Sequence, residues 1–74
     1  MAKKQATEGV YRVTEVIGTS NTSWEDAASN AVAAASRTLR DLRIAEISKL
    51  DMKVEDGKVV AYRARILLSF KYDA

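Results

Sequence analysis

The side chains that this sequence offers for catalysis are few. The 74 residues contain no cysteine and no histidine, which excludes disulfides, cysteine-based metal sites, nucleophile–histidine dyads and histidine acid–base chemistry. Paired-carboxylate catalysis by the adjacent Glu25 and Asp26 would need a cleft and a perturbed neighbour. Their position near a predicted helix start is explained by capping and by the helix dipole. We therefore predict that the protein is not an enzyme.

The charged residues best placed for binding are Glu46, Arg63 and Arg65. All three lie on one face of a predicted hairpin, with Glu46 diagonal to Arg65 across the two strands. Two interpretations remain open. The arginines can form salt bridges with Glu46 that are buried between subunits, or they can neutralise an anionic ligand. We favour the salt bridges because an oligomer must pair the charges that it buries.

Gly18-Thr19-Ser20 separates a predicted strand from a predicted helix. Thr22 and Glu25 have the spacing of a capping box, so we expect the helix to begin at this point. The backbone amides here are also able to bind an anion at the helix N-terminus, and an enzyme built on such an anion site is a further alternative. The segment lacks the Gly-Lys-Ser/Thr that ends a phosphate-binding loop, so a plain strand-to-helix turn is favoured.

The hydrophobic pattern predicts an α+β domain of order β-α-β-β. The predicted elements are a strand over Val10 to Ile17, a helix over Ser23 to Leu42, and two strands over Arg43 to Val54 and Lys58 to Tyr72. The apolar stripe of the helix is mostly alanine, so the helix alone supplies a thin core. Its tryptophan, Trp24, is read as an anchor at the edge of the core rather than as a ligand-stacking residue.

Asp56 and Gly57 predict a tight turn that sets the register of the hairpin. Ile47 then lies opposite Ile66 on the face expected to bind the helix. Ala45 lies opposite Leu68 on the same face. On the other face the predicted partners pair Ile44, Glu46, Ser48, Leu50, Met52 and Val54 with Ser69, Leu67, Arg65, Arg63, Ala61 and Val59, in that order.

This register makes the apolar character change sides along the hairpin. Toward the tip it places an apolar patch on the face away from the helix, made of Leu50, Met52, Val54, Val59 and Ala61. A strand of about 15 residues spans about 50 Å, whereas a helix of about 20 residues spans about 30 Å. The hairpin must therefore extend beyond its own helix. We predict that the patch is a subunit interface.

Composition is consistent with one small domain that needs a partner. A single chain of this length buries little surface, and oligomerisation is the stabiliser that remains. We expect residues 1–9 to form a flexible tail and residues 10–73 to form the domain. The net charge of +2 comes from dispersed charges, so no nucleic-acid partner is expected. The chain has neither an apolar membrane span nor a secretory signal, and we expect a cytoplasmic protein without a membrane partner.

From Val10 to Asp73 the chain resembles the dodecin family. The resemblance rests on Val16-Ile17-Gly18-Thr19-Ser20, the helix start Thr22-Ser23-Trp24-Glu25-Asp26-Ala27-Ala28, Ala45-Glu46-Ile47, the long Asp-Gly hairpin, and the ending Leu68-Ser69-Phe70-Lys71-Tyr72. It implies a three-stranded antiparallel sheet that partly wraps one helix, and a hollow homododecamer. It also implies a small-molecule ligand that is bound or stored without catalysis, which in many members is a flavin.

The resemblance places the flavin-equivalent positions at Ile44, Glu46, Arg63 and Arg65. Flavin-binding members have a stacking tryptophan where this chain has Ile44, and a glutamine where it has Arg63. Isoleucine has no π face, and arginine lacks the acceptor of glutamine. The sequence is more similar to the branch without that tryptophan, for which calcium is the bound species. The resemblance thus implies two candidate ligands, a flavin (FMN, FAD or riboflavin) or Ca²⁺. Because the chain has no contiguous calcium loop, the residues that would bind a metal are not assigned.

Overall fold

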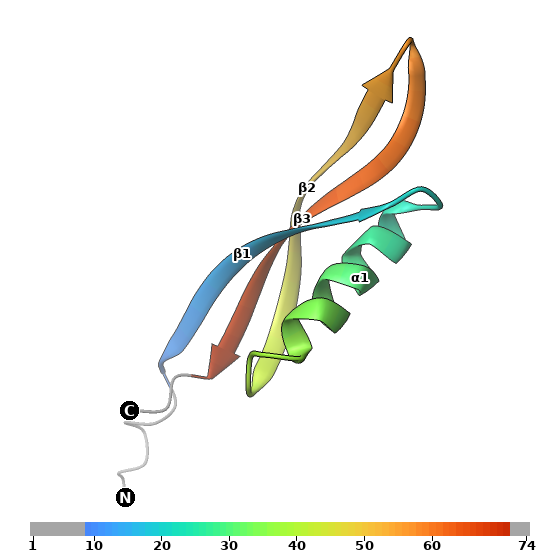
Figure 1. Ribbon diagram of the computed structural model, residues 1–74. Helices are drawn as coiled ribbons and strands as arrows, with labels where there is room; N and C mark the ends of the chain where they lie inside the picture. Colours follow the sequence, from blue (N-terminus) through green and yellow to red (C-terminus); the bar gives the residue numbers. More distant parts are fainter. Residues whose placement is uncertain (1–8, 72–74) are drawn as a thin grey trace, which may run out of the picture.

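The computed structural model describes residues 9–71, which form an α+β unit of order β-α-β-β (Figure 1). The elements are β1 (Tyr11–Ser20), α1 (Trp24–Ser36), β2 (Leu42–Glu55) and β3 (Lys58–Lys71). The three strands form one antiparallel sheet of order β1-β3-β2, so β3 is central. The predicted fold class is confirmed. The predicted tail falls almost wholly on residues 1–8, and the expected ends of the last strand and of the domain fall on residues 72–73, all outside the described residues.

The helix begins one residue later than the capping box predicts. Its N-cap is Ser23, whose Oγ accepts a hydrogen bond from the backbone N–H of Asp26 at 3.0 Å. The cause lies upstream, at Ser20. The Oγ of Ser20 accepts hydrogen bonds from the backbone N–H groups of Thr22 and Ser23, and its hydroxyl donates to the Asp26 carboxylate at 2.7 Å. This turn holds Ser23 in extended geometry at the cap, so Thr22 and Glu25 do not form the predicted pair.

The helix ends at Ser36, not at Leu42. The amides of Thr38 and Leu39 both donate to the carbonyl of Ala35, which closes the last turn, and Asp41 then adopts a left-handed φ of 57°. This reversal sends the chain into β2, which starts at Leu42. Arg37 is the C-cap of the helix.

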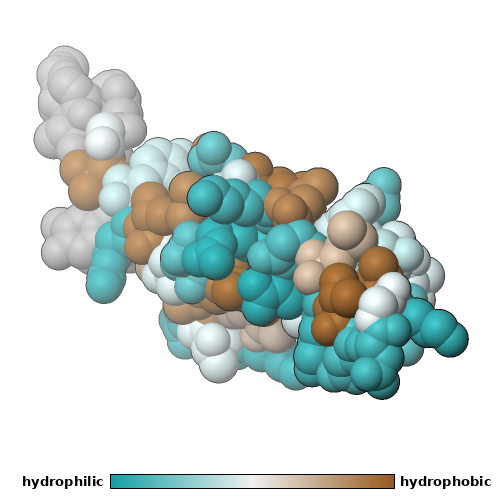
Figure 2. All heavy atoms as spheres, turned by 90° about the horizontal axis from the view of Figure 1, so that it is seen from above, coloured by the Kyte–Doolittle hydropathy of each residue, from teal (hydrophilic) through white to brown (hydrophobic). Residues whose placement is uncertain are grey.

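The core is the thin layer that the alanine stripe predicts. Ala27, Ala31 and Ala35 of α1 pack on a row of β3, and the buried residues of that row are Ala64, Ile66 and Leu68. Gly18 of β1 lies directly beneath the helix, where a Cβ would collide with the carbonyl of Ala27 and with the Ala31 side chain. Small residues on both elements thus let α1 lie close to the sheet. Figure 2 shows that apolar side chains remain exposed among polar ones on one side of the molecule.

The hairpin turn is the predicted one, and it extends beyond the helix. Asp56 and Gly57 both have positive φ, 53° and 75°, as a two-residue hairpin loop requires. The first turn of α1 reaches only as far as the middle of the hairpin, where the Trp24 indole N–H donates to the carbonyl of Asp51 at 3.0 Å. Figure 1 shows the remainder of β2 and β3 continuing past the helix.

The register of the hairpin differs from the prediction in its middle. Ile44, Ala45, Glu46 and Ile47 have their predicted partners, but a β-bulge at Ser48 then shifts the pairing by one residue. The Ser48 hydroxyl donates to the carbonyl of Arg65 at 3.2 Å within this bulge. The observed pairs after it are Lys49 with Arg65, Leu50 with Ala64, Asp51 with Arg63, Met52 with Tyr62 and Lys53 with Ala61.

The bulge corrects the prediction that apolar character changes sides. Ala64, which faces α1, is the partner of Leu50, and directly paired residues share a face. Leu50 and Met52 therefore remain on the helix side of the sheet. A second irregularity between Lys53 and Val54 restores the predicted pair of Val54 with Val59. Strand alternation places that pair on the same side as Met52.

Candidate functional site

The candidate site is the outer face of the sheet, defined as the face that α1 does not cover. Pairing and alternation give its residues. It comprises Tyr11, Val13, Glu15, Ile17 and Thr19 of β1, Arg63, Arg65, Leu67, Ser69 and Lys71 of β3, and Ile44, Glu46, Lys49, Asp51 and Lys53 of β2. The four flavin-equivalent residues, Ile44, Glu46, Arg63 and Arg65, thus share one face. Ala61, which the sequence grouped with the apolar patch, is on this outer face beside Lys53.

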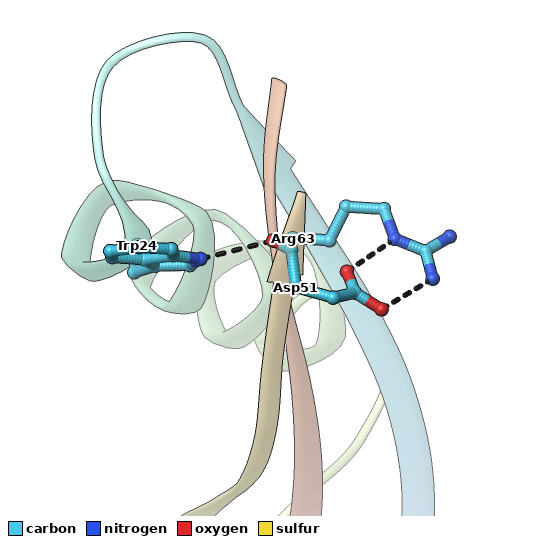
Figure 3. A network of polar contacts seen from close by, with 3 residues as sticks. All are labelled: Trp24, Asp51 and Arg63. Atoms are coloured by element: carbon cyan, nitrogen blue, oxygen red, sulfur yellow. Dashed lines mark hydrogen bonds and ion pairs between the residues drawn. The ribbon is translucent and has the colours of Figure 1, made fainter. Parts of the chain in front are cut away.

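Arg63 is held by Asp51, its direct partner across the hairpin. Its Nε donates to Oδ1 of Asp51 at 2.7 Å and its second terminal nitrogen donates to Oδ2 at 2.8 Å. The hydrogen bond from Arg63 lowers the pKa of the Asp51 carboxyl and raises the pKa of the guanidinium. Sequence reasoning missed this pair because an unbulged register places Asp51 on the opposite face. Figure 3 shows the carboxylate and the guanidinium on the side of β2 away from Trp24.

Arg65 is paired with Glu15 of β1, at 3.5 Å, and not with Glu46. Glu46 lies opposite Leu67, and the bulge brings Lys49 to the position beside Arg65 that Ser48 would otherwise occupy. Within one chain Arg65 is therefore held by Glu15 and not by Glu46, and the salt bridges expected between subunits stay a prediction. Within residues 9–71, Glu46 has no ion pair. The alternation of the first strand already placed Glu15 on one face with Ile17. The sequence did not show which strand pairs with it, so the contact with Arg65 was missed.

Trp24 has the anchoring role that the sequence suggests. Its ring meets the Tyr62 ring edge-on, with centroids 5.0 Å apart and an interplanar angle of 69°. Its N–H donates a hydrogen bond to the Asp51 carbonyl. The indole is thus held by both Tyr62 and Asp51 on the helix side of the sheet. Asp51 consequently joins two systems, through its carbonyl to Trp24 and through its carboxylate to Arg63 (Figure 3).

Among residues 9–71, the outer face has no aromatic ring beside Ile44. The Ile44 side chain is 54% exposed and lies opposite Ser69. Tyr11, the aromatic residue of the described outer face, belongs to the far edge strand, β1. Ile44, the position where the resemblance predicts a stacking ring in flavin-binding members, is therefore aliphatic.

Among residues 9–71, no three acidic side chains lie close enough together to bind a metal ion. Calcium requires six to eight oxygen ligands, so the described part of one copy does not supply a complete set. The α-helix in that same part of the chain is too short and too polar to cross a membrane.

The family model for dodecins matches residues 10–73. The chain belongs to the dodecin family. It is 44% identical over 62 residues to the calcium dodecin of Mycobacterium tuberculosis, covering 84% of this chain and 87% of that one. Dodecin from Streptomyces coelicolor superposes with a TM-score of 0.82 at 40% identity, covering 88% of this chain and 93% of that one.

A crystal structure of the M. tuberculosis calcium dodecin is also similar to this dodecin. It superposes with a TM-score of 0.77 at 44% identity and covers 88% of this chain and 93% of the other. That protein is described as a calcium-chelating antigen with a novel calcium-binding site.

Proposed function

We propose that this dodecin is a non-enzymatic subunit of a closed homododecamer that binds calcium rather than a flavin. The choice of calcium over a flavin rests on the side chains of the outer face. Ile44 offers no ring, and both arginines are already paired with carboxylates, Arg63 with Asp51 and Arg65 with Glu15. A phosphorylated flavin would have to displace an ion pair and would gain no stacking energy in return.

Assembly is supported by the apolar surface that a single chain leaves exposed. Ile66 and Leu68 are the large side chains that are fully buried. Leu50, Met52, Val54 and Val59 on the hairpin are between 46% and 57% exposed. Apolar surface of this extent on long strands with open edges is typical of subunit interfaces. We place the interface on the helix side of the hairpin, with these four residues at its centre, and Ala61 outside it.

Calcium is supported by the relatives and by one unpaired acid. Glu46 is the outer-face carboxylate that neither arginine holds. A single Glu46 cannot complete a calcium site. We propose that Glu46 residues from neighbouring copies approach one another in the assembly and supply carboxylate oxygens to the ion. Where no calcium is bound, these like charges would repel.

The test is calorimetric titration of the assembled protein with Ca²⁺, Mg²⁺ and riboflavin. We expect saturable binding of Ca²⁺, weaker binding of Mg²⁺, and little heat with riboflavin. Glu46→Gln should weaken calcium binding, whereas Glu25→Gln, which removes the same charge at the helix start, should not. Tight riboflavin binding together with no response to Ca²⁺ would overturn the choice of ligand. Unchanged calcium affinity in Glu46→Gln would overturn the assignment of that residue.

A further inference from the structure

A groove runs between α1 and β2 on the helix side of the sheet, with a volume of about 360 Å³. Ala28, Val32 and Ala33 of the helix form one wall, and Ala45 and Ile47 of β2 form the other. None of the described residues that line it carries a charge. We call this surface the helix groove. Its chemistry fits an apolar occupant.

The chain that forms the helix groove does not fill it. The walls are built largely from alanine, so they leave space above the sheet. Ile47 is 51% exposed, although its direct partner across the hairpin, Ile66, is fully buried. A large apolar side chain at the edge of the core is thus left in water by the single chain, which is typical of a surface that a partner covers.

The hairpin tip, defined as residues 54–60, is a second apolar surface that its own chain leaves uncovered. Val54 is 57% exposed, Val59 46% and Val60 40%. The helix reaches only as far as the pair of Met52 and Tyr62, where the Trp24 ring meets Tyr62. Figure 1 shows the tip continuing past the first turn of α1, whereas the helix groove lies beside the middle of the helix. The tip therefore does not reach the groove of its own chain.

The charges next to these valines do not prevent their burial. Lys53 belongs to the outer face, and its Nζ lies 3.5 Å from the Glu55 carboxylate. The two charges nearest to Val54 in sequence therefore pair with each other on the opposite side of β2 from the valine. An apolar partner can cover the valines without burying either charge.

The helix groove and the hairpin surface assigned to the interface are continuous along β2. Ile47 lines the groove, and Leu50, Met52 and Val54 follow it on the same side of the sheet. Each copy thus presents, on one side of one strand, both an unfilled apolar groove and a projecting apolar tip.

We propose that the hairpin tip of a second copy occupies the helix groove, with Val54 and Val59 placed between α1 and β2. The inference rests on the proposed assembly and names the two surfaces that meet in it. A contact between two different surfaces is heterologous, so every copy gives one tip and receives another, and a ring closes when the rotation allows it. A tip-to-tip contact would be isologous and would end at a dimer.

The first test is cross-linking between introduced cysteines, because the natural chain has none. Ser29 lines the groove and is exposed, and Val54 is exposed at the tip. The variant carrying both Ser29→Cys and Val54→Cys, treated with bismaleimidoethane, should give covalent multimers larger than a dimer on a denaturing gel. Either substitution alone should give monomers.

Light scattering of the same samples separates this contact from the assembly itself. A full-size oligomer of the double variant without covalent multimers would overturn the contact and leave the proposed assembly standing. A dissociated unmodified protein would overturn the assembly, and the contact with it. Covalent dimers formed by Val54→Cys alone would show that tips meet one another, and would overturn the contact as well.

The second test places a charge in the groove. Ala33 lines it and Ala34 does not, and both are exposed in the single chain. Ala33→Asp should therefore lose the full-size species, whereas Ala34→Asp should keep it. Adding Val54→Lys to Ala33→Asp should restore the full-size species by pairing the two charges. A full-size Ala33→Asp oligomer with an unchanged melting temperature, or an equal loss of assembly in Ala33→Asp and Ala34→Asp, would overturn the groove as the binding surface.

Discussion

Asp51 and Arg63 face each other across β2 and β3 and share two hydrogen bonds, at 2.7 and 2.8 Å. They meet because the bulge at Ser48 shifts the register of the hairpin by one residue. The same shift keeps Leu50 and Met52 on the helix side. One inserted residue thus decides both how the outer face pairs its charges and which side of the hairpin is apolar.

The Asp51–Arg63 pair should make stability depend on pH. Because Arg63 lowers the pKa of Asp51 in the folded state, the pair stabilises the fold fully above the ordinary aspartate pKa of about 4. This contribution is lost as the pH falls through the lowered pKa. We therefore expect Asp51→Asn to melt below the unmodified protein at neutral pH, and the two melting curves to converge in acid. The control is Asp56→Asn in the hairpin turn, whose effect should not follow this pattern. A constant difference between Asp51→Asn and the unmodified protein at every pH would contradict the pairing.

Met52→Asp should dissociate the assembly. Met52 is 46% exposed in the single chain and lies in the surface assigned to the interface, where burying an unpaired carboxylate costs several kcal/mol, on the order of 3 to 5. Light scattering should report a smaller species. Thr22→Asp, which adds the same charge in the exposed turn before the helix, should leave the oligomer intact. If Met52→Asp kept both its size and its melting temperature, Met52 would lie outside every interface.

Ile44→Trp should create or strengthen flavin binding. A ring at this position supplies the missing stacking surface, which is worth about 1 to 3 kcal/mol. Quenching of riboflavin fluorescence measures the effect. Ile17→Trp places the same ring on the other edge strand of the outer face and should have a smaller effect. Tight binding of riboflavin by the unmodified protein would show that a different residue provides the platform.

Gly18→Ala should destabilise the subunit, because the added Cβ would meet the Ala27 carbonyl and the Ala31 side chain. Overpacking of this kind costs about 1 to 3 kcal/mol. Gly9→Ala is the control, since a Cβ at Gly9 meets no atom within 4 Å. Denaturant unfolding measures the free energy of unfolding of both variants. Equal values would mean that α1 can move away from β1 without a loss of stability.

Local chemistry made much of the fold predictable from sequence. Asp56 and Gly57 select the hairpin turn, and the alternation next to it pairs Ile47 with Ile66, as observed. The bulge at Ser48 was not predictable, because a serine within a strand gives no sequence signal for a bulge. An unbulged register also pairs almost as many apolar residues. The helix end was missed because Leu39 and Leu42 continue the helical spacing, although the chain reverses at Asp41.

The sequence predicted which residues of the candidate site share a face, but not which residues they contact. Ile44, Glu46, Arg63 and Arg65 share the outer face because strand alternation alone places them there. Their partners depend on the bulge and on the pairing of β1 with β3, which brings Glu15 to Arg65. No local pattern encodes that long-range pairing.

Native mass spectrometry of the protein purified from cells tests the central claim most directly, because one spectrum reports the number of 8.2 kDa chains, bound calcium and bound flavin. We predict a single assembly of dodecameric mass that carries calcium, loses the added mass on chelation, and contains no flavin. A monomer, or a dodecamer saturated with flavin and free of calcium, would contradict the account.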